Sequence, residues 1–235
     1  MNYMKTKMLI AMIIIVLAAI PAAAVFAQDS FTFEVTEGFS FAEESDIAAI
    51  DISVPRVSGM ADENDEILLN AHFLAKKDEI IADYKQNTEM AAANYPDGNG
   101  PHFEYKYSWE IVTDDEDHFV IWTTYFFAAG SAGEQNEFFN LDKKTGKLLD
   151  FDADAVTSLE EMAKVREQIF TSMNNANLAG ADFWTEGDAL DVQLGQVRYL
   201  NHWYYNKNGE LVICFDEAEI APASRGTVYF VIGKN

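Results

Sequence analysis

The residues of this 235-residue chain best suited to metal binding or nucleophilic catalysis are four histidines and one cysteine. His72, His102, His118 and His202 do not have, to one another or to Cys214, the spacing that zinc sites use. The His-Glu-x-x-His motif, the phosphate-binding loop, the dinucleotide glycine fingerprint and the Gly-x-Ser-x-Gly elbow are also absent from the sequence. The sequence therefore predicts no metal site, no cofactor and no catalytic residue.

Carboxylates are the other groups that could do chemistry, and the chain has 39 of them. Two carboxylates at a suitable separation can hydrolyse a glycosidic bond, but among so many no particular pair stands out. Two acidic clusters, at 114–117 and 150–154, could chelate calcium weakly. Neither has the glycine and the glutamate that an EF-hand loop places at its sixth and twelfth positions. We interpret the first cluster as a solvated turn and the second as the charged end of a strand. A cell-wall hydrolase that uses carboxylates stays an alternative to a non-catalytic protein.

Apolar patterns in the first part of the chain predict the elements that would position such groups. Strands are expected at 31–36 and 50–54, the second ending at Pro55, because proline cannot donate to a sheet ladder. A helix follows, with Asp62 as its N-cap, and ends before the turn-like segment 96–101. The predicted apolar face of this helix contains Ile67, Ala71, Leu74, Ile81 and Tyr84.

The centre of the chain has the clearest β pattern. Segments 103–112 and 118–127 predict two long strands joined by a short acidic turn, which is a hairpin. A third strand is expected at 137–141, and the chain returns at 147–151 after a turn in which Gly146 can take positive φ. These strands together predict an antiparallel meander.

A second helix is predicted to begin at Ser158, because Ser158 and Glu161 have the spacing of a capping box. Its predicted apolar face contains Leu159, Met162, Ile169 and Met173. Segment 174–190 resembles a loop.

Closing strands are predicted at 203–205, 210–215 and 227–232. Strands and helices are thus segregated, which predicts an α+β fold: antiparallel sheets, two main helices packed against them, and two sub-lobes. We expect the N-terminal lobe at 28–155 and the C-terminal lobe at 156–235.

The first 27 residues have the layout of a secretory signal peptide. Lys5 and Lys7 precede an apolar run that decays into small residues, and we expect cleavage between Ala27 and Gln28. The alternative is an uncleaved membrane anchor, since a spanning helix needs roughly 20 apolar residues. Cleavage predicts an extracytoplasmic protein, secreted or associated with the cell surface and not inserted in the membrane. With only Cys214 it forms no intramolecular disulfide.

The net charge is −23, and it becomes more negative when the two lysines of the signal peptide are removed. This charge predicts that nucleic acid is not a partner, and it would steer a basic protein or peptide towards the surface. Solubility alone is the alternative explanation for the charge.

Three segments of the chain, in the same order, carry a family resemblance. They are the strand and proline at 52–59 with Asn70 in the helix that follows, the turn motif at 140–149, and the closing signature at 215–222 with Gly226. The chain resembles the extracytoplasmic domain of RsiV-type anti-sigma factors, which also precedes the catalytic domain of PdaC-type peptidoglycan deacetylases. The resemblance extends from about Phe31 to the end of the chain.

In the RsiV receptors a domain of this type binds lysozyme, so the resemblance implies a basic protein such as lysozyme, or peptidoglycan, as the ligand. The sequence differs at three places: the histidine usual near 129–135 is missing, and alanine replaces the two tyrosines of the closing signature at 218 and 223. The loop with Pro222 has a partly fixed conformation, which lowers the cost of ordering it upon binding. The predicted ligand or partner contacts are Ser131, Gly133, Glu219, Pro222 and Ser224.

We therefore expect a secreted, non-catalytic binding or sensor-type module of the bacterial envelope. The segment before the apolar run is too short for a sigma-binding region, and no deacetylase domain follows, so we expect the extracytoplasmic domain alone. A wall hydrolase and a purely structural wall component are the alternatives. The sequence leaves the oligomeric state open.

Overall fold

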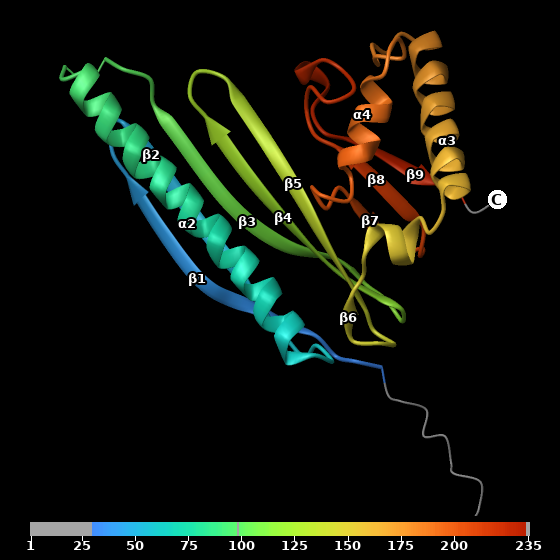
Figure 1. Ribbon diagram of the computed structural model, residues 1–235. Coiled ribbons are helices and arrows are strands. Elements are labelled where there is room, and N and C mark those ends of the chain that lie inside the picture. The colour runs from blue at the N-terminus through green and yellow to red at the C-terminus, as the bar shows by residue number, and fades with distance from the viewer. Residues whose placement is uncertain (1–29, 98, 234–235) are drawn as a thin grey trace, which may run out of the picture.

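The computed structural model describes residues 30–97 and 99–233, which form two β-sheets with helices packed against them (Figure 1). The predicted signal peptide and its cleavage site between Ala27 and Gln28 lie outside the described residues. The first sheet has the strand order β1-β2-β3-β4-β5-β6, and the second has the order β7-β8-β9. The strands of the first sheet are β1 (Glu34–Glu44), β2 (Ala48–Ser58), β3 (Phe103–Asp114), β4 (His118–Ala128), β5 (Ala132–Asp142) and β6 (Lys147–Leu148). Those of the second are β7 (Trp203–Tyr205), β8 (Leu211–Phe215) and β9 (Val228–Ile232).

The predicted α+β class is confirmed, with one exception to the antiparallel pairing. Strands β2 and β3 pair in parallel, from Ala48 opposite Phe103 to Ile52 opposite Tyr107. Between them the chain forms helix α2 (Glu63–Asn94), which crosses the sheet and returns the chain in the same direction. The predicted hairpin of β3 and β4 and the meander through β5 and β6 are present.

Strand β1 and the proline of β2 differ from the sequence prediction. The strand begins at Glu34 and runs to Glu44, well beyond the predicted 31–36. Pro55 lies inside β2, opposite Glu37, where the expectation was the end of that strand. The ladder shifts register between Glu37 and Phe39, so the missing N–H of Pro55 falls beside a β-bulge, where regular pairing is already interrupted.

Helix α2 starts as predicted but turns a different face to the sheet. The side chain of Asp62 accepts a hydrogen bond from the backbone N–H of Asn64 at 2.8 Å, which makes it the N-cap. The predicted face was wrong in its first half, where Ile67 and Leu74 are 58% and 44% exposed, and right in its second half, where Tyr84 is buried and Ile81 packs against the core. Apolar residues occur on more than one side of this helix, so their spacing alone does not identify the packed face. The buried residues are Leu69, Phe73, Ile80, Tyr84 and Ala91.

Loss of the α2 cap gives the first testable expectation. Asp62→Ala should lower the free energy of unfolding by about 1 kcal/mol, the usual contribution of an N-cap side chain. Urea denaturation measures this loss. Asp65→Ala is the matched control, since Asp65 is a first-turn acid that interacts with the helix dipole without being the cap. An equal loss in both variants would contradict a specific capping role for Asp62.

The C-terminal part contains one helix more than predicted. Helix α3 (Leu159–Leu178) has Ser158 as its N-cap, and the hydroxyl of Ser158 accepts from the backbone N–H of Glu161 at 3.2 Å, as the capping box predicts. Ile169 and Met173 are buried, whereas Leu159 is 90% exposed and does not belong to the packed face. The expected loop at 174–190 was wrong at both ends. Helix α3 continues to Leu178, and a short helix, α4 (Ala189–Gln196), follows.

The segment between the two sheets is not the single strand that was predicted at 147–151. Strand β6 ends at Leu148, and residues Phe151–Ala155 form a single π-helical turn, η1. Asp150 caps this turn by accepting hydrogen bonds from the backbone N–H groups of Asp152 and Ala153. The cluster at 150–154 is therefore a helix start rather than a charged strand end.

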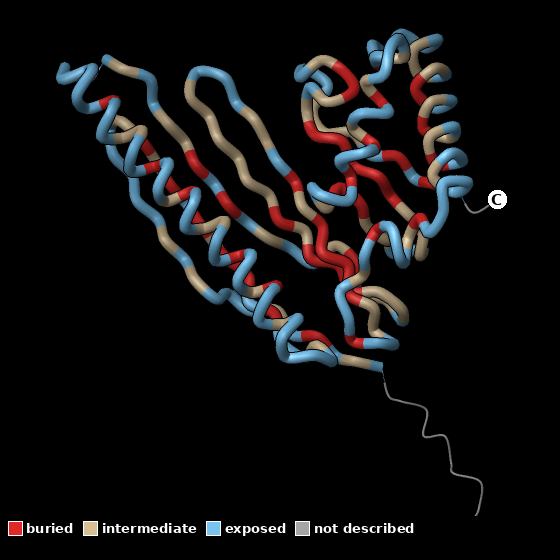
Figure 2. Tube along the Cα trace, viewed as in Figure 1, coloured by how far each residue is buried: buried red, intermediate tan, exposed pale blue. Residues whose placement is uncertain are grey.

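The first sheet has a packed core on each face, because side chains alternate along its strands. On one face Phe73 of α2 packs against Phe139 of β5, with ring centroids 4.9 Å apart. On the other, Val120 and Phe138 form a small buried cluster with Cys214 of β8. The buried segments of Figure 2 concentrate where β4 and β5 approach the second sheet. The two sheets thus share a core, and the predicted boundary between lobes near residue 155 stays a prediction.

Candidate functional site

Two buried asparagines of β5 hold the second sheet against the first. Asn140 donates from Nδ2 to the carbonyl of Trp203 at 2.9 Å, and its Oδ1 accepts from the backbone N–H of Tyr205 at 3.0 Å. Both partners lie on β7. Because residues four apart on a strand share a face, Asn136 points to the same side of the sheet as Asn140.

Asn136 makes the second polar contact, to a carboxylate directly after β8. Its Nδ2 donates to Asp216 Oδ1 at 2.6 Å, and its backbone N–H donates to Asp216 Oδ2 at 3.1 Å. Its own Oδ1 accepts from the indole N–H of Trp122 at 2.8 Å. Asp216 therefore accepts from the backbone N–H of Asn136, which lies on the edge of β5 where no neighbouring strand pairs with it. These two hydrogen bonds hold the start of the loop that follows β8.

His202 lies between Asp216 and a second acid of that loop, Glu219. Its Nε2 is 3.4 Å from Asp216 Oδ2, its Nδ1 is 3.6 Å from Glu219 Oε2, and the residue is only 4% exposed. Burial alone lowers the pKa of His202, but the hydrogen bonds and charges of Asp216 and Glu219 outweigh burial and raise this pKa to about 9. At neutral pH the site therefore holds a buried imidazolium between two carboxylates. We name His202, Asp216, Glu219 and Asn136 the buried polar cluster.

Above this cluster the tip of the β4–β5 hairpin faces the loop after β8 across a depression of about 340 Å³, the acidic hollow. The structure brings Gly133 and Glu219 together here, since both line the hollow. A Cβ added to Gly133 would lie 3.4 Å from Oε1 of Glu217, so the two segments are in close contact. The lining residues are Tyr125, Phe127, Gly133, Glu134, Gln135, Asp216, Glu217 and Glu219.

The other three predicted contacts do not line the acidic hollow. Ser131 is exposed at the hairpin tip, where its carbonyl accepts from the N–H of Ala129 at 2.9 Å. Pro222 is half-buried and precedes the short 3-10 helix η2 (Ala223–Arg225), on which Ser224 is exposed. Ser131 lies two residues before Gly133 in the chain, and Pro222 and Ser224 follow Glu219 in the segment after β8. Their role as contacts stays a prediction.

The charges of the acidic hollow are not fully compensated. Asp216 and Glu219 both face His202, but Glu134 and Glu217 form no ion pair among the described residues. Glu134 accepts one long hydrogen bond, from Asn136 Nδ2 at 3.4 Å. Two aromatic side chains, Tyr125 and Phe127, form the apolar part of the lining. Uncompensated carboxylates beside aromatic rings are suited to a lysine or arginine side chain.

The two positions where the family resemblance has tyrosines are both on this loop and both exposed. Ala218 has φ 62, in the left-handed region that side chains other than glycine, asparagine and aspartate rarely occupy. Ala223 begins η2. The loop thus keeps a defined path through Glu219 and Pro222, but presents only methyl groups at these two positions.

A second, smaller depression, the inner hollow, adjoins the acidic hollow and shares Tyr125, Gln135, Asp216 and Glu219 with it. It encloses about 200 Å³ and extends from the buried polar cluster towards Lys76 of α2.

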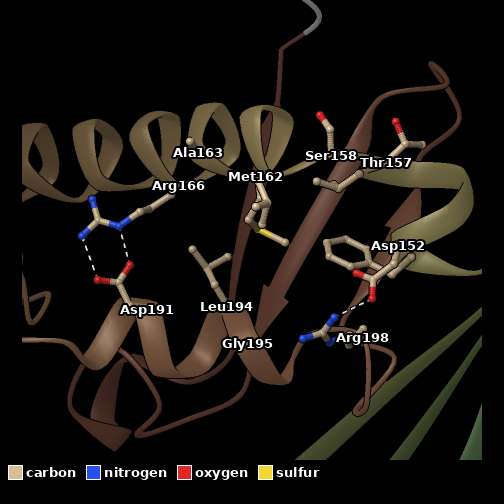
Figure 3. Close-up of a pocket in the computed structure, with 13 residues that line it drawn as sticks. Asp152, Thr157, Ser158, Met162, Ala163, Arg166, Asp191, Leu194, Gly195 and Arg198 are labelled. Atoms are coloured by element: carbon tan, nitrogen blue, oxygen red, sulfur yellow. Dashed lines mark hydrogen bonds and ion pairs between the residues drawn. The ribbon is translucent and has the colours of Figure 1, made fainter.

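A larger groove of about 560 Å³ lies between α3 and α4, and Figure 3 shows its lining. Met162 and Leu194 form its apolar floor, and two ion pairs flank it: Arg166 with Asp191, and Arg198 with Asp152. None of the predicted contacts lines this groove. Since each arginine already has a carboxylate partner, the groove presents no unpaired charge for a ligand.

The described residues contain no group of three or more histidine, cysteine, aspartate or glutamate side chains arranged to hold a metal ion. In the same part of the chain no helix is long and apolar enough to span a bilayer.

The buried polar cluster was not predicted. Its histidine was noted only because it lacks metal-ligand spacing, and burial of Asn136 and Asp216 cannot be inferred from residue type, since both are usually exposed. One signal was available: Asn136 and Asn140 flank Phe138 on one face of β5, and Phe138 is an apolar residue expected to be buried.

The chain is similar in sequence to a known anti-sigma factor. No family model matches the chain. It is 25% identical over 194 residues to the anti-sigma-V factor RsiV of Bacillus subtilis (strain 168), a match that covers 81% of this chain and 64% of RsiV. The chain therefore spans less than two thirds of the length of this relative.

Two solved structures are similar. A member of the DUF3298 family from Bacteroides fragilis NCTC 9343 superposes with a TM-score of 0.60 at 12% identity, covering 87% of this chain and 92% of that one. A DUF3298 family protein from Pseudomonas aeruginosa PAO1 gives a TM-score of 0.45 at 11% identity, covering 87% and 91%. At such identities the first likeness shows a shared fold. The predicted resemblance to RsiV-type anti-sigma factors is thus confirmed, and the chain has the fold of a DUF3298 domain.

Proposed function

We propose that this protein is an extracytoplasmic, non-catalytic module of sensor type that binds a basic protein such as lysozyme, or a cell-wall component. The similarity to an anti-sigma factor supports a regulatory role that depends on protein partners. The sequence prediction of a signal peptide supports a place outside the cytoplasm. The net charge of −23 supports a basic partner.

The observation that carries the proposal is the meeting of the β4–β5 hairpin with the loop after β8. These segments lie more than 80 residues apart in sequence, yet both line the acidic hollow. The buried polar cluster holds the loop after β8 in place, because Asp216 and Glu219 belong to this loop and both contact His202. A binding surface whose loops are already positioned loses little conformational entropy on association.

Titration of the purified protein with a C-type lysozyme, followed calorimetrically at low and at physiological salt, tests the proposal. Saturable binding that persists at physiological salt is the expected result, with weaker binding as salt increases because opposite charges are screened. Absence of heat at both salt concentrations would rule out lysozyme and leave cell-wall fragments as the ligand. Release of reducing ends from purified peptidoglycan would instead favour the alternative, a wall hydrolase.

Removal of the two uncompensated charges should weaken capture of the basic partner. Glu134→Gln combined with Glu217→Gln is expected to raise the Kd for lysozyme about three- to tenfold at low salt, mainly through slower association. Glu63→Gln with Glu89→Gln on α2 is the matched control, since it changes the net charge equally and neither residue lines the hollow. Equal losses in both double variants would show a general charge effect and contradict a contact at the acidic hollow.

A further inference from the structure

The outer edge of the first sheet, formed by β1, has backbone groups that no other segment covers. Strand β1 is the last strand on that side, so it pairs only with β2 (Figure 1). The opposite edge differs, because residues near the second sheet reach it: the backbone N–H of Phe138 donates to the carbonyl of Asn201 at 2.9 Å. Among the described residues, no segment other than β2 makes a backbone hydrogen bond with β1.

The turn between β1 and β2 shows which backbone groups of β1 point outward. The backbone N–H of Ser45 donates to the carbonyl of Ala48 at 2.9 Å, so Ser45 directs its backbone groups towards β2. This direction alternates from one residue to the next in an antiparallel pair, and the register with β2 is regular over residues 39–44. Three residues therefore direct their N–H and C=O groups away from the sheet: Ser40, Ala42 and Glu44.

The side chains at this edge leave the backbone accessible. Ser40 and Ala42 are small, and both are exposed. Phe39 and Phe41, which alternate with them, pack against the core on the face that α2 covers. A free row of backbone donors and acceptors in an edge strand is the surface to which an extended peptide adds as a further strand.

The charges beside this edge decide which peptide would fit. Lys77 of α2, which lies over the ring of Phe39, is paired with Asp78 at 2.8 Å. Arg56, the basic residue of β2, is opposite Thr36, on the other side of the β-bulge. Four acids near residues 39–44 form no ion pair among the described residues: Glu43, Glu44, Asp46 and Asp51.

A second copy of this chain is a poor occupant, because it would place an acidic strand against an acidic strand, and like charges directly opposite are destabilising. The same carboxylates favour a strand that carries lysine or arginine. We propose that the outer edge of β1, at residues 39–44, binds an extended basic peptide segment, which adds to the first sheet as a further strand. This inference goes beyond the proposed function, since none of these residues lines the acidic hollow.

The experiment is an NMR titration of the ¹⁵N-labelled protein at low salt with a short peptide of alternating lysine and valine. Saturable shifts are expected at the amides of residues 39–44, with slower hydrogen exchange at Ser40, Ala42 and Glu44. Two control peptides are titrated in separate samples. The same peptide with every backbone amide methylated keeps the charge and loses the donors, and a peptide of alternating glutamate and valine reverses the charge. Neither should bind at this edge.

Proline at position 42 tests the outward N–H directly. Ala42→Pro removes this donor but spares the ladder to β2, since proline is tolerated where the N–H of an edge strand faces solvent. It should weaken peptide binding about tenfold, the usual effect of one lost hydrogen bond. Ala42→Val is the matched control, because it keeps the N–H and should bind the peptide as the parent does. Both variants should keep the parent's amide spectrum outside β1 and β2, and its affinity for lysozyme.

The carboxylates are tested separately, so the proposal does not depend on how well the proline variant folds. Glu43→Gln combined with Glu44→Gln should weaken peptide binding about three- to tenfold at low salt.

Four results would overturn the proposal. They are the absence of saturable shifts at residues 39–44, equal affinity for the methylated peptide, equal peptide affinity in the parent and Ala42→Pro, and shifts of the same amides with protein concentration alone. The last result would identify a second copy as the occupant. Peptide binding at β1 without any binding of lysozyme would contradict only the proposed lysozyme contact.

Discussion

His202→Gln is expected to lower the free energy of unfolding at pH 7 by about 3 kcal/mol, the range in which removal of one partner from a buried ion pair lies. Glutamine can still donate one hydrogen bond, but it cannot neutralise Asp216 and Glu219, which face the ring at 3.4 and 3.6 Å. The variant therefore keeps two carboxylates close together in a poorly hydrated place. Urea denaturation of the parent and the variant measures the difference.

The same cluster sets a dependence of stability on pH. The pKa of His202 rises from its ordinary 6.5 to about 9 in the folded protein, so folding favours the protonated ring. Its contribution is therefore fully present below pH 6.5 and is lost as the pH rises through about 9. A rise of this size corresponds to about 3 kcal/mol. Parent stability should fall between pH 6.5 and 9, and the His202→Gln curve should be flatter in that window.

His102→Gln is the matched control, because His102 is exposed in a loop and far from any buried carboxylate pair. It should change stability by less than about 0.5 kcal/mol. Parallel stability curves for the parent and His202→Gln between pH 6 and 10 would show that the ring is not held as an imidazolium. The loop after β8 would then need another anchor.

The sequence was sufficient to predict most strands and both helix starts, because these depend on local signals. Asp62 and Ser158 are caps whose side chains bind backbone N–H groups within the next three residues. The turn at Gly146 takes positive φ, as its glycine predicts. The order of the three motifs also sufficed for the resemblance to RsiV, which the comparison confirms.

Features that depend on distant contacts could not be predicted in this way. The packed face of α2 is decided by the sheet beneath it, and Phe73, which packs on Phe139, was outside the predicted face. The parallel pairing of β2 with β3 follows from the path of α2 across the sheet. The contacts that carry the site join residues about 80 positions apart, such as Asn136 and Asp216. Nothing in the sequence distinguishes Asp216, which contacts Asn136, from the other acidic residues among the 39.

Asn136→Ala combined with Asn140→Ala is the second large expected effect. Asn136→Ala removes the side-chain bond to Asp216 and leaves the indole N–H of Trp122 without a partner. Asn140→Ala leaves the carbonyl of Trp203 and the N–H of Tyr205 unpaired. Each buried group left without a partner costs about 1–3 kcal/mol, so each single variant should lose about 3 kcal/mol.

Asn174→Ala is the matched control, since the amide of Asn174 donates to the carbonyl of Phe170 within its own helix and joins no two elements. It should cost about 1 kcal/mol or less. Comparison with this variant separates the loss of a contact between sheets from the loss of an asparagine.

The double variant should do more than add the two losses, because Asn136 and Asn140 are the buried polar side chains of β5 that fasten the second sheet to the first. Hydrogen exchange at the amides of β3 and β8 reports on the two sheets separately. In the parent both sets should exchange through one cooperative opening. In the double variant β8 should exchange through a less costly opening than β3, as expected if residues 28–155 and 156–235 are lobes that the asparagines couple. Equal protection of both sheets in the double variant would mean that the apolar cluster of Val120, Phe138 and Cys214 suffices to join them, and would contradict the two-lobe organisation.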